Sequence, residues 1–163
     1  MIYDFHFANY DTVFDLEAEF RRLAIKSYCY EFYTAIEVIK YGKGNDLEWQ
    51  NGYWGNRAVR QADAFHGWFI ERYTGCNSKL KFKQQLIQKE RWVHKDTVSL
   101  RVFDYTQECA SLSHELADEK LLVVEGNLVN AYKEQHGTRP VLNIAKTKGE
   151  VAGNNFKQLF DFG

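Results

Sequence analysis

A chain of 163 residues is long enough for one well-buried domain with a small appendage. Apolar residues make up 45% of it, which excludes a largely disordered chain, and the aromatic fraction of 16% is high enough that some aromatic side chains are expected at a binding surface. The net charge is only −1, but residues 79–148 hold 12 Lys/Arg against 9 Asp/Glu, so the basic excess is concentrated in that stretch.

The three cysteines, Cys29, Cys76 and Cys109, are odd in number and widely spaced. They form neither a zinc-binding pattern nor a disulfide framework, so a reducing compartment is expected. No apolar run reaches the length of a membrane-spanning helix, and the amino terminus lacks the basic-then-apolar pattern of a signal peptide. We therefore expect a cytoplasmic protein that does not contact a membrane.

The first 60 residues predict an amino-terminal extension. Residues 1–8 alternate as a short strand does, and residues 12–26 carry the apolar stripe of an amphipathic helix. Residues 28–41 fit either a strand or a continued helix. Residues 47–54 fit the second arm of a hairpin, and residues 57–64 are compatible with a short helix.

The order of elements in the second half of the chain is that of a small barrel. Two alternating segments are followed by a helical pattern, an almost wholly apolar run and a further alternating segment; in order, these are residues 80–92, 98–103, 107–117, 121–128 and 139–145. Such an order makes up most of an OB-fold, a five-stranded Greek-key barrel that binds oligonucleotides or oligosaccharides. We therefore predict a mainly β (α+β) protein, an OB-fold barrel with an amino-terminal extension that contains a helix and a strand.

Four short motifs accompany these segments: Lys89-Glu90-Arg91-Trp92, Val102-Phe103, Leu122-Val123-Val124-Glu125-Gly126-Asn127-Leu128 and Tyr132-Lys133-Glu134-Gln135-His136-Gly137. With them the chain resembles, over about residues 65–148, the DNA-binding domain of bacterial and phage single-stranded DNA-binding proteins. The resemblance implies an OB-fold domain at residues 61–148, with its first strand at residues 66–75, between the extension of residues 1–60 and a tail at residues 149–163. In a second arrangement, residues 28–41 are the first barrel strand and residues 57–73 are an inserted loop.

Cations and flat aromatic side chains hold single-stranded nucleic acid, and both are frequent in the predicted barrel. The resemblance implies that Trp92, Phe103 and Tyr132 stack on bases, although Thr97 stands where the family has another stacking aromatic. Arg101 is expected on the same strand face as Phe103, where it suits a phosphate contact. The predicted nucleic-acid-binding residues are Lys81, Lys83, Lys89, Arg91, Trp92, Lys95, Arg101, Phe103, Tyr132 and Lys133.

The predicted function is binding of single-stranded DNA, without marked sequence preference, in replication, recombination or repair. The alternatives are a protein-interaction OB domain that binds or inhibits another protein, and an RNA-binding OB domain. The sequence shows no P-loop, dinucleotide-binding glycine motif or paired-histidine metal motif, and no nucleophile beside a base. We therefore expect a protein that is not an enzyme and that uses no metal or cofactor.

The end of the chain carries a separate apolar segment. Phe156, Leu159 and Phe160 stand at i, i+3 and i+4, and Phe162 follows two residues later. This is the spacing by which a short helix places an apolar face in a groove. We expect the tail to dock on its own barrel or on a second subunit of a homo-oligomer, or to recruit a replication or repair protein.

Overall fold

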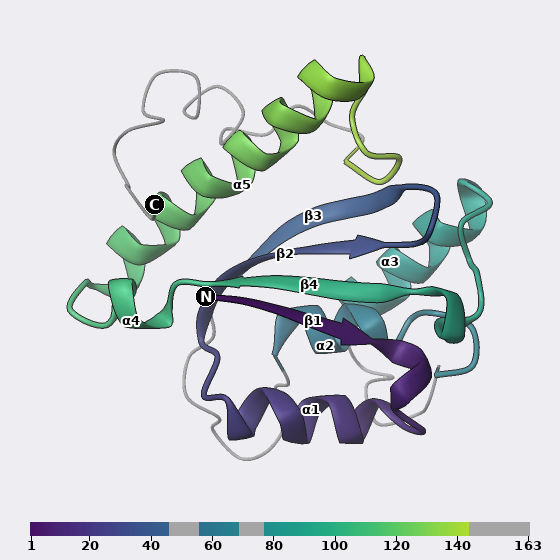
Figure 1. Ribbon diagram of the computed structural model, residues 1–163, viewed down its shortest axis with the longest axis horizontal. Helices are drawn as coiled ribbons and strands as arrows, with labels where there is room; N and C mark the ends of the chain where they lie inside the picture. Colours follow the sequence, from purple (N-terminus) through teal and green to yellow (C-terminus); the bar gives the residue numbers. More distant parts are fainter. Residues whose placement is uncertain (46–55, 69–76, 144–163) are drawn as a thin grey trace.

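The computed structural model describes residues 1–45, 56–68 and 77–143 (Figure 1). The described part is a four-stranded sheet with helices on both faces. In chain order its elements are β1 (Ile2–His6), the 3-10 turn η1 (Phe7–Asn9), α1 (Val13–Arg22), β2 (Ser27–Tyr33), β3 (Val38–Asn45), α2 (Arg57–Ala62), α3 (Asn77–Gln88), the 3-10 turn η3 (Lys95–Thr97), β4 (Ser99–Asp104), α4 (Thr106–Cys109) and α5 (His114–His136).

The strands are ordered β1-β4-β2-β3, and every neighbouring pair is antiparallel. β4 lies between β1 and β2, so that Leu100 is opposite Phe5 on one side and Phe32 on the other. β1 and β3 are edges of this sheet, which is therefore open. The predicted five-stranded OB-fold barrel is wrong.

The first cause of that error is α3, since residues 80–92 were expected to be a strand. Phe82 and Leu86 are four residues apart and both are buried, whereas Leu80 and Ile87 are exposed. This is the pattern of a helix with one buried side. The lysines and glutamines that fill the segment are good helix formers and favour the same outcome.

The second cause is α5, which contains the predicted strand of residues 121–128. The helix expected at residues 107–117 is divided, because α4 ends at Cys109 and α5 begins after Ser113, whose hydroxyl accepts a hydrogen bond from the first turn. α5 then continues to Gly137, which ends it with a φ of 76°. Valines lower helix propensity only slightly, and burial of the helix against the sheet outweighs that cost.

Other elements agree with the sequence pattern. β4 confirms the strand expected at residues 98–103, α1 the helix expected within residues 12–26, and α2 the short helix within residues 57–64. β1 confirms the strand within residues 1–8. Residues 28–41, which fitted either a strand or a helix, belong to the antiparallel hairpin of β2 and β3.

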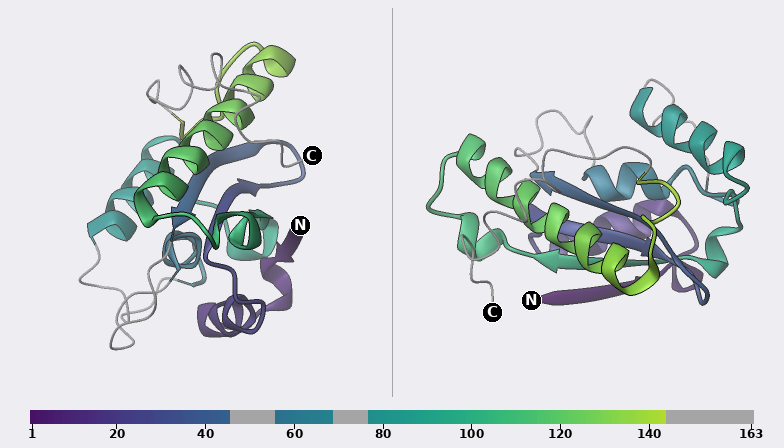
Figure 2. Two further views of the ribbon diagram at one scale, coloured as in Figure 1. Left: turned by 90° about the vertical axis from the view of Figure 1, so that its left-hand side faces the viewer. Right: turned by 90° about the horizontal axis from the view of Figure 1, so that it is seen from above.

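β2 directs apolar side chains to both faces of the sheet. Tyr28, Tyr30 and Phe32 enter the larger core, which is shared with α1, α2 and α3. Cys29 enters a smaller core on the opposite face, where Leu121 of α5 packs. Figure 2 shows α5 crossing one side of the sheet while α1 lies on the other. Within the described residues, no helix combines the length and apolarity needed to cross a membrane.

A short segment after α5 lies along the outer edge of β3. Leu142 N donates a hydrogen bond to Ile39 O at 3.0 Å. Asn143 Oδ1 accepts from Tyr41 N at 2.8 Å, and Asn143 Nδ2 donates to Tyr41 O at 3.1 Å. The described part of the strand expected at residues 139–145 is therefore a turn held on the sheet edge.

Several expectations fall wholly or partly outside the described residues. The hairpin arm at residues 47–54 and the apolar tail with Phe156, Leu159, Phe160 and Phe162 are among them. Of the strand expected at residues 66–75, only the first three residues are described, and His66 forms an isolated parallel bridge with His94.

Candidate functional site

A cavity of about 300 Å³ opens at the edge strand β3, with walls from β2, β3, α2, α5 and the turn after α5. The polar side chains among its lining residues come from positions far apart in the sequence. They are Tyr30, Lys40, Tyr41, Lys43, Arg57, Glu125 and Asn143.

Glycines of β3 allow tyrosines of β2 to lie flat across the strand. Gly42 is opposite Tyr30 and Gly44 is opposite Tyr28. A Cβ atom on Gly42 would lie within 3.0 Å of the Tyr30 ring, closer than real Cβ atoms approach other atoms. The missing side chain therefore lets the Tyr30 hydroxyl reach α2, where it donates a hydrogen bond to Gln61 Oε1 at 2.6 Å.

Arg57 begins α2 at the rim of the cavity. The preceding residue, Asn56, caps the helix, because its side-chain oxygen accepts a hydrogen bond from Ala58 N at 3.1 Å. The nearby Tyr30 hydroxyl raises the pKa of the Arg57 guanidinium. The cap and this neighbour together place a permanent positive charge beside a phenol.

Lys40 supplies a second cation to the cavity. Its amine lies 5.2 Å from the centre of the Phe82 ring. Burial, followed by the nearby charges of Arg57 and Lys81, lowers the pKa of Lys40 to about 8, although Glu125 opposes the shift. Near neutral pH this amine therefore exists in both its charged and its neutral form.

Glu125 is the acidic residue that lines the cavity, and it is only 8% exposed. Burial raises the pKa of its carboxyl group, while Lys43, Lys40 and Arg57 act in the opposite direction. Lys43 is also tied to Asp118 of α5, with 2.6 Å between Nζ and Oδ1. Among the described residues, the cavity thus combines three basic side chains with one buried carboxyl group.

Asn143 closes the cavity on its outer side through its two hydrogen bonds to the main chain of Tyr41. The Tyr41 ring packs edge-on against Tyr132 of α5, with 6.3 Å between ring centres. Because Tyr41 also anchors the turn that carries Asn143, the position of β3 relative to α5 determines the shape of the site.

The predicted nucleic-acid-binding residues do not line this cavity and are divided among several surfaces. Lys81, Lys83 and Lys89 belong to α3 or the turn after it, and Lys83 Nζ lies 4.9 Å from the centre of the Trp92 ring. Trp92 is half-buried and its Nε1 donates a hydrogen bond to Ala64 O at 2.9 Å. The nearby Arg91 forms an ion pair with Glu37.

The other predicted residues serve structural contacts. Lys95 is buried, and its amine donates hydrogen bonds to main-chain carbonyls of the segment around η1. Phe103 packs against the smaller core beside α5, and Lys133 is also on α5. Lys95 and Phe103 are therefore poorly placed for contact with a nucleic acid.

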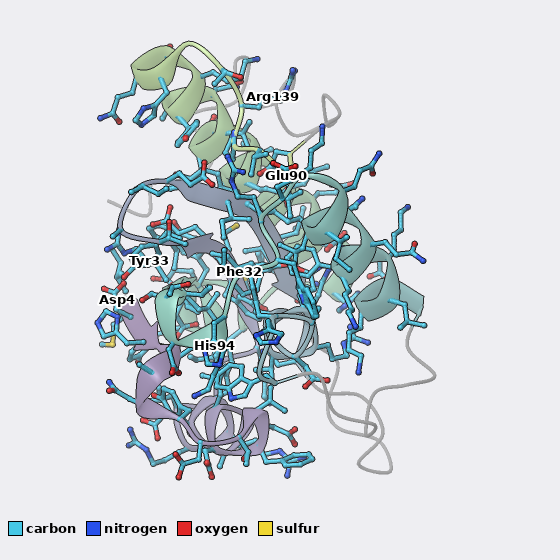
Figure 3. All side chains as sticks on the ribbon, turned by 90° about the vertical axis from the view of Figure 1, so that its right-hand side faces the viewer. Asp4, Phe32, Tyr33, Glu90, His94 and Arg139 are labelled. Carbon is cyan, nitrogen blue, oxygen red and sulfur yellow. The ribbon has the colours of Figure 1, made fainter. Side chains whose placement is uncertain are left out.

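Arg101 of β4 lies in a row of charged groups that continues onto β1 and β2. Its guanidinium contacts Asp4 of β1 at 3.0 Å and Glu31 of β2 at 3.0 Å. Tyr33 donates a hydrogen bond to Asp4 at 2.8 Å, and Figure 3 shows Asp4 and Tyr33 near one another at this side of the molecule. The positive charge of Arg101 is therefore balanced by acidic neighbours within the fold.

Sequence reasoning missed the cavity because its residues span positions 30 to 143. One local signal was present: tyrosines at 28 and 30 and glycines at 42 and 44 alternate with the same period on two segments that can pair. A glycine in a strand often marks the close approach of another group. That signal predicts the position of the tyrosine rings, but not the arrival of Glu125 from α5.

Comparison of the chain with family models, with curated proteins and with solved structures finds no match. Function is therefore argued from the cavity itself. Within the described residues, no group of three or more His, Cys, Asp or Glu side chains is placed to hold a metal ion.

Proposed function

We propose that the cavity at β3 binds a phosphodiester of a nucleic acid and hydrolyses it with the help of a divalent cation held at Glu125. The observation that carries the proposal is the arrangement of Arg57, Lys40 and Lys43 around one buried carboxyl group. A phosphodiester is anionic and rich in hydrogen-bond acceptors, so it matches the excess of positive charge in the cavity.

Arg57 is suited to hold a phosphate. Its planar guanidinium can donate two parallel hydrogen bonds to phosphate oxygens, and it lies beside the Tyr30 hydroxyl. Preorganised positive charge of this kind stabilises the charge that develops when phosphoryl groups react. The Tyr30 hydroxyl, which is hydrogen-bonded to Gln61 and lies near Arg57, lines the cavity and can exchange a proton with a water molecule there.

Glu125 is suited to a hard cation that arrives with the substrate. Mg²⁺ keeps several of its waters and is commonly bound through one or two carboxylates together with phosphate oxygens, so a single glutamate is a sufficient protein ligand. Such an ion polarises the phosphoryl group and favours attack by water. Glu125 must be ionised to bind it: burial raises the pKa of its carboxyl group, whereas Lys43, Lys40 and Arg57 act in the opposite direction.

A nucleic acid remains the proposed ligand class. The proposed surface differs from the one expected from sequence, and hydrolysis with a metal ion replaces the expected binding without catalysis or metal. Lys81 of α3 contributes to the lowered pKa of Lys40, and we propose that phosphate contacts continue from the cavity toward this lysine. The alternative function is binding of single strands without cleavage. Its support is the group of Lys81, Lys83 and Lys89 on and after α3, beside Trp92.

The test is cleavage of fluorescent single-stranded and duplex oligonucleotides in the presence of Mg²⁺ or Mn²⁺. We expect cleavage by the full chain that is abolished by EDTA, and a loss of about 10²–10³-fold in rate for Arg57→Gln. Glu125→Gln is expected to lose metal-dependent cleavage, whereas Glu119→Gln, which changes an exposed residue of the same helix, is expected to retain it.

Circular dichroism of each variant controls for folding. Equal cleavage by Glu125→Gln and the unaltered protein would show that Glu125 does not hold the metal. Salt-sensitive binding of the oligonucleotides without any cleavage would support the alternative function instead.

A further inference from the structure

The surroundings of the Lys40 amine differ from those of Lys43 and Lys79. Among the residues that the structure describes, no carboxylate lies within ion-pair distance of it. By contrast, Lys43 is paired with Asp118 at 2.6 Å, and Lys79 is paired with Asp63 at 2.9 Å. Lys40 therefore lines the cavity with an amine that forms no ion pair with any carboxylate of the described residues.

The groups around Lys40 favour a neutral amine. Arg57 of α2 and Lys81 of α3 repel its positive charge, the Phe82 ring of α3 replaces water on one side, and Glu125 of α5 is the nearby group that attracts the charge. With a pKa of about 8, roughly one tenth of the amine is neutral at pH 7. An amine in such surroundings, desolvated and beside other cations, is a nucleophile toward carbonyl carbon.

We propose that Lys40 Nζ forms an imine with the aldehyde of a deoxyribose that has lost its base, within a nucleic-acid strand bound at the cavity. The inference rests on the proposed function for the presence of a strand in the cavity, but it needs neither the metal nor hydrolysis. The abasic sugar carries an aldehyde between two phosphates, which matches an amine without an ion pair beside two further cations. In the proposed complex Arg57 and Lys43 contact the phosphates, and Lys40 reaches the carbonyl carbon.

The chemistry is balanced without an added oxidant or reductant. The nitrogen lone pair of the neutral amine adds to the aldehyde carbon, and the carbonyl oxygen leaves as water with the two protons of the amine, so that a carbon–nitrogen double bond remains. The imine acidifies the proton on the neighbouring sugar carbon. The Glu125 carboxylate, in the same cavity, can accept that proton.

Strand scission then follows by elimination. As the proton leaves, its electron pair forms a carbon–carbon double bond, and the bond between the next carbon and its phosphate oxygen breaks. The phosphate departs as an anion, which Arg57 is placed to stabilise. Water hydrolyses the unsaturated imine, returns the Lys40 amine and releases the shortened strand.

The experiment uses the full chain, a fluorescent single-stranded oligonucleotide with one abasic site, EDTA to exclude metal-dependent cleavage, and sodium borohydride to reduce the imine to a stable amine. We expect a covalent protein–oligonucleotide complex whose cross-linked peptide contains Lys40. Lys40→Arg keeps the charge but cannot form the imine, so the yield of the covalent complex is expected to fall by at least about tenfold. The matched variant Lys26→Arg, which changes an exposed lysine outside the cavity, is expected to give as much complex as the unaltered protein.

Mapping of the cross-link in the unaltered protein does not depend on any variant folding. A cross-link at another lysine, or equal trapping by Lys40→Arg, would overturn the proposal. Trapping of glyceraldehyde 3-phosphate at Lys40 without trapping of the oligonucleotide would also overturn it, because the ligand would then be a small phosphorylated aldehyde. Successful trapping without metal-dependent cleavage would refute only the hydrolytic function. Metal-dependent cleavage without trapping at Lys40 would refute only the imine.

Discussion

Substitution of Gly42 by alanine tests the geometry on which the cavity depends. The added Cβ would lie within 3.0 Å of the Tyr30 ring, whereas ordinary van der Waals contact begins at 3.4 Å. The ring cannot move easily, because it is fully buried, packs against Tyr28 and Phe32 with ring centres 5.8 and 5.4 Å away, and donates its hydroxyl hydrogen to Gln61.

We expect Gly42→Ala to lower the free energy of unfolding by about 1–3 kcal/mol, the usual cost of overpacking a core. For a chain of this length, the melting temperature should fall by roughly 2–12 °C, since each kcal/mol corresponds to about 2–4 °C. The measurement is thermal and urea unfolding followed by circular dichroism. Removal of the ring tip with Tyr30→Leu should abolish the collision, so Gly42→Ala should cost much less in that background.

Two results would refute the reasoning. Unchanged stability of Gly42→Ala would show that Tyr30 does not lie across β3 as described. An equal cost in the presence and absence of the tyrosine ring would show that the cost arises from the backbone of β3. In either case the placement of the Tyr30 hydroxyl beside Arg57 would lose its support.

Three further substitutions test other parts of the fold. Lys79→Met removes the ion pair that the buried Asp63 forms with Lys79 at 2.9 Å, so the free energy of unfolding measured in urea should fall by about 3–5 kcal/mol. A fall of less than about 1 kcal/mol would contradict the burial of the pair. Trp92→Ala should lower stability by about 0.5–3 kcal/mol in thermal unfolding, because the ring is half-buried and its Nε1 is hydrogen-bonded; an unchanged melting temperature would instead place the ring on the surface. The pKa of Lys40 is 10.5 ordinarily and about 8 in the folded protein, so between pH 8 and 10.5 the unfolded chain binds more protons and stability should rise with pH. Lys40→Met should therefore be more stable than the unaltered protein at pH 7, and this difference in stability should shrink from pH 8 to 10.5. A stability difference that does not change with pH would contradict the lowered pKa of Lys40.

The sequence predicted the elements in which pattern and burial agree. In residues 98–103 the alternation of Val98, Leu100 and Val102 matches a strand that lies between two others, and these side chains are buried. In α1 the spacing of Leu16 and Phe20 matches a helix with one buried side. Where a single period explains burial, sequence alone is sufficient.

The errors arose where two periods fit the same residues. Leu80, Phe82 and Leu86 satisfy alternation, but Phe82 and Leu86 also satisfy helical spacing, and the fold buries only the latter pair. Residues 121–128 are apolar nearly throughout, so periodicity cannot distinguish a buried strand from a buried helix. An apolar run of eight residues is short for a helix, and α5 is recognised only when the polar turns on both sides of the run are included.

The site could not be predicted because it is assembled by sheet order. Arg57 reaches Tyr30 only because β2 and β3 pair and α2 follows them, and Glu125 arrives from a helix that packs on the opposite face of the sheet from α2. The insertion of β4 between β1 and β2 is a long-range pairing with no local signal. Because the polar residues of the cavity come from separate elements, they do not form a contiguous sequence motif.

The position of a bound metal ion and phosphate is the most direct test of the proposed site. Mn²⁺ broadens the NMR signals of nearby atoms, so it can be added to the isotope-labelled full chain together with a phosphorothioate oligonucleotide that resists cleavage. We predict selective broadening of the main-chain amides of Gly42, Lys43 and Glu125, its loss in Glu125→Gln and its retention in Glu119→Gln. Broadening that persists in Glu125→Gln, or that centres on Asp4 and Glu31 across the sheet, would contradict the assignment of the cavity as the site of phosphodiester chemistry.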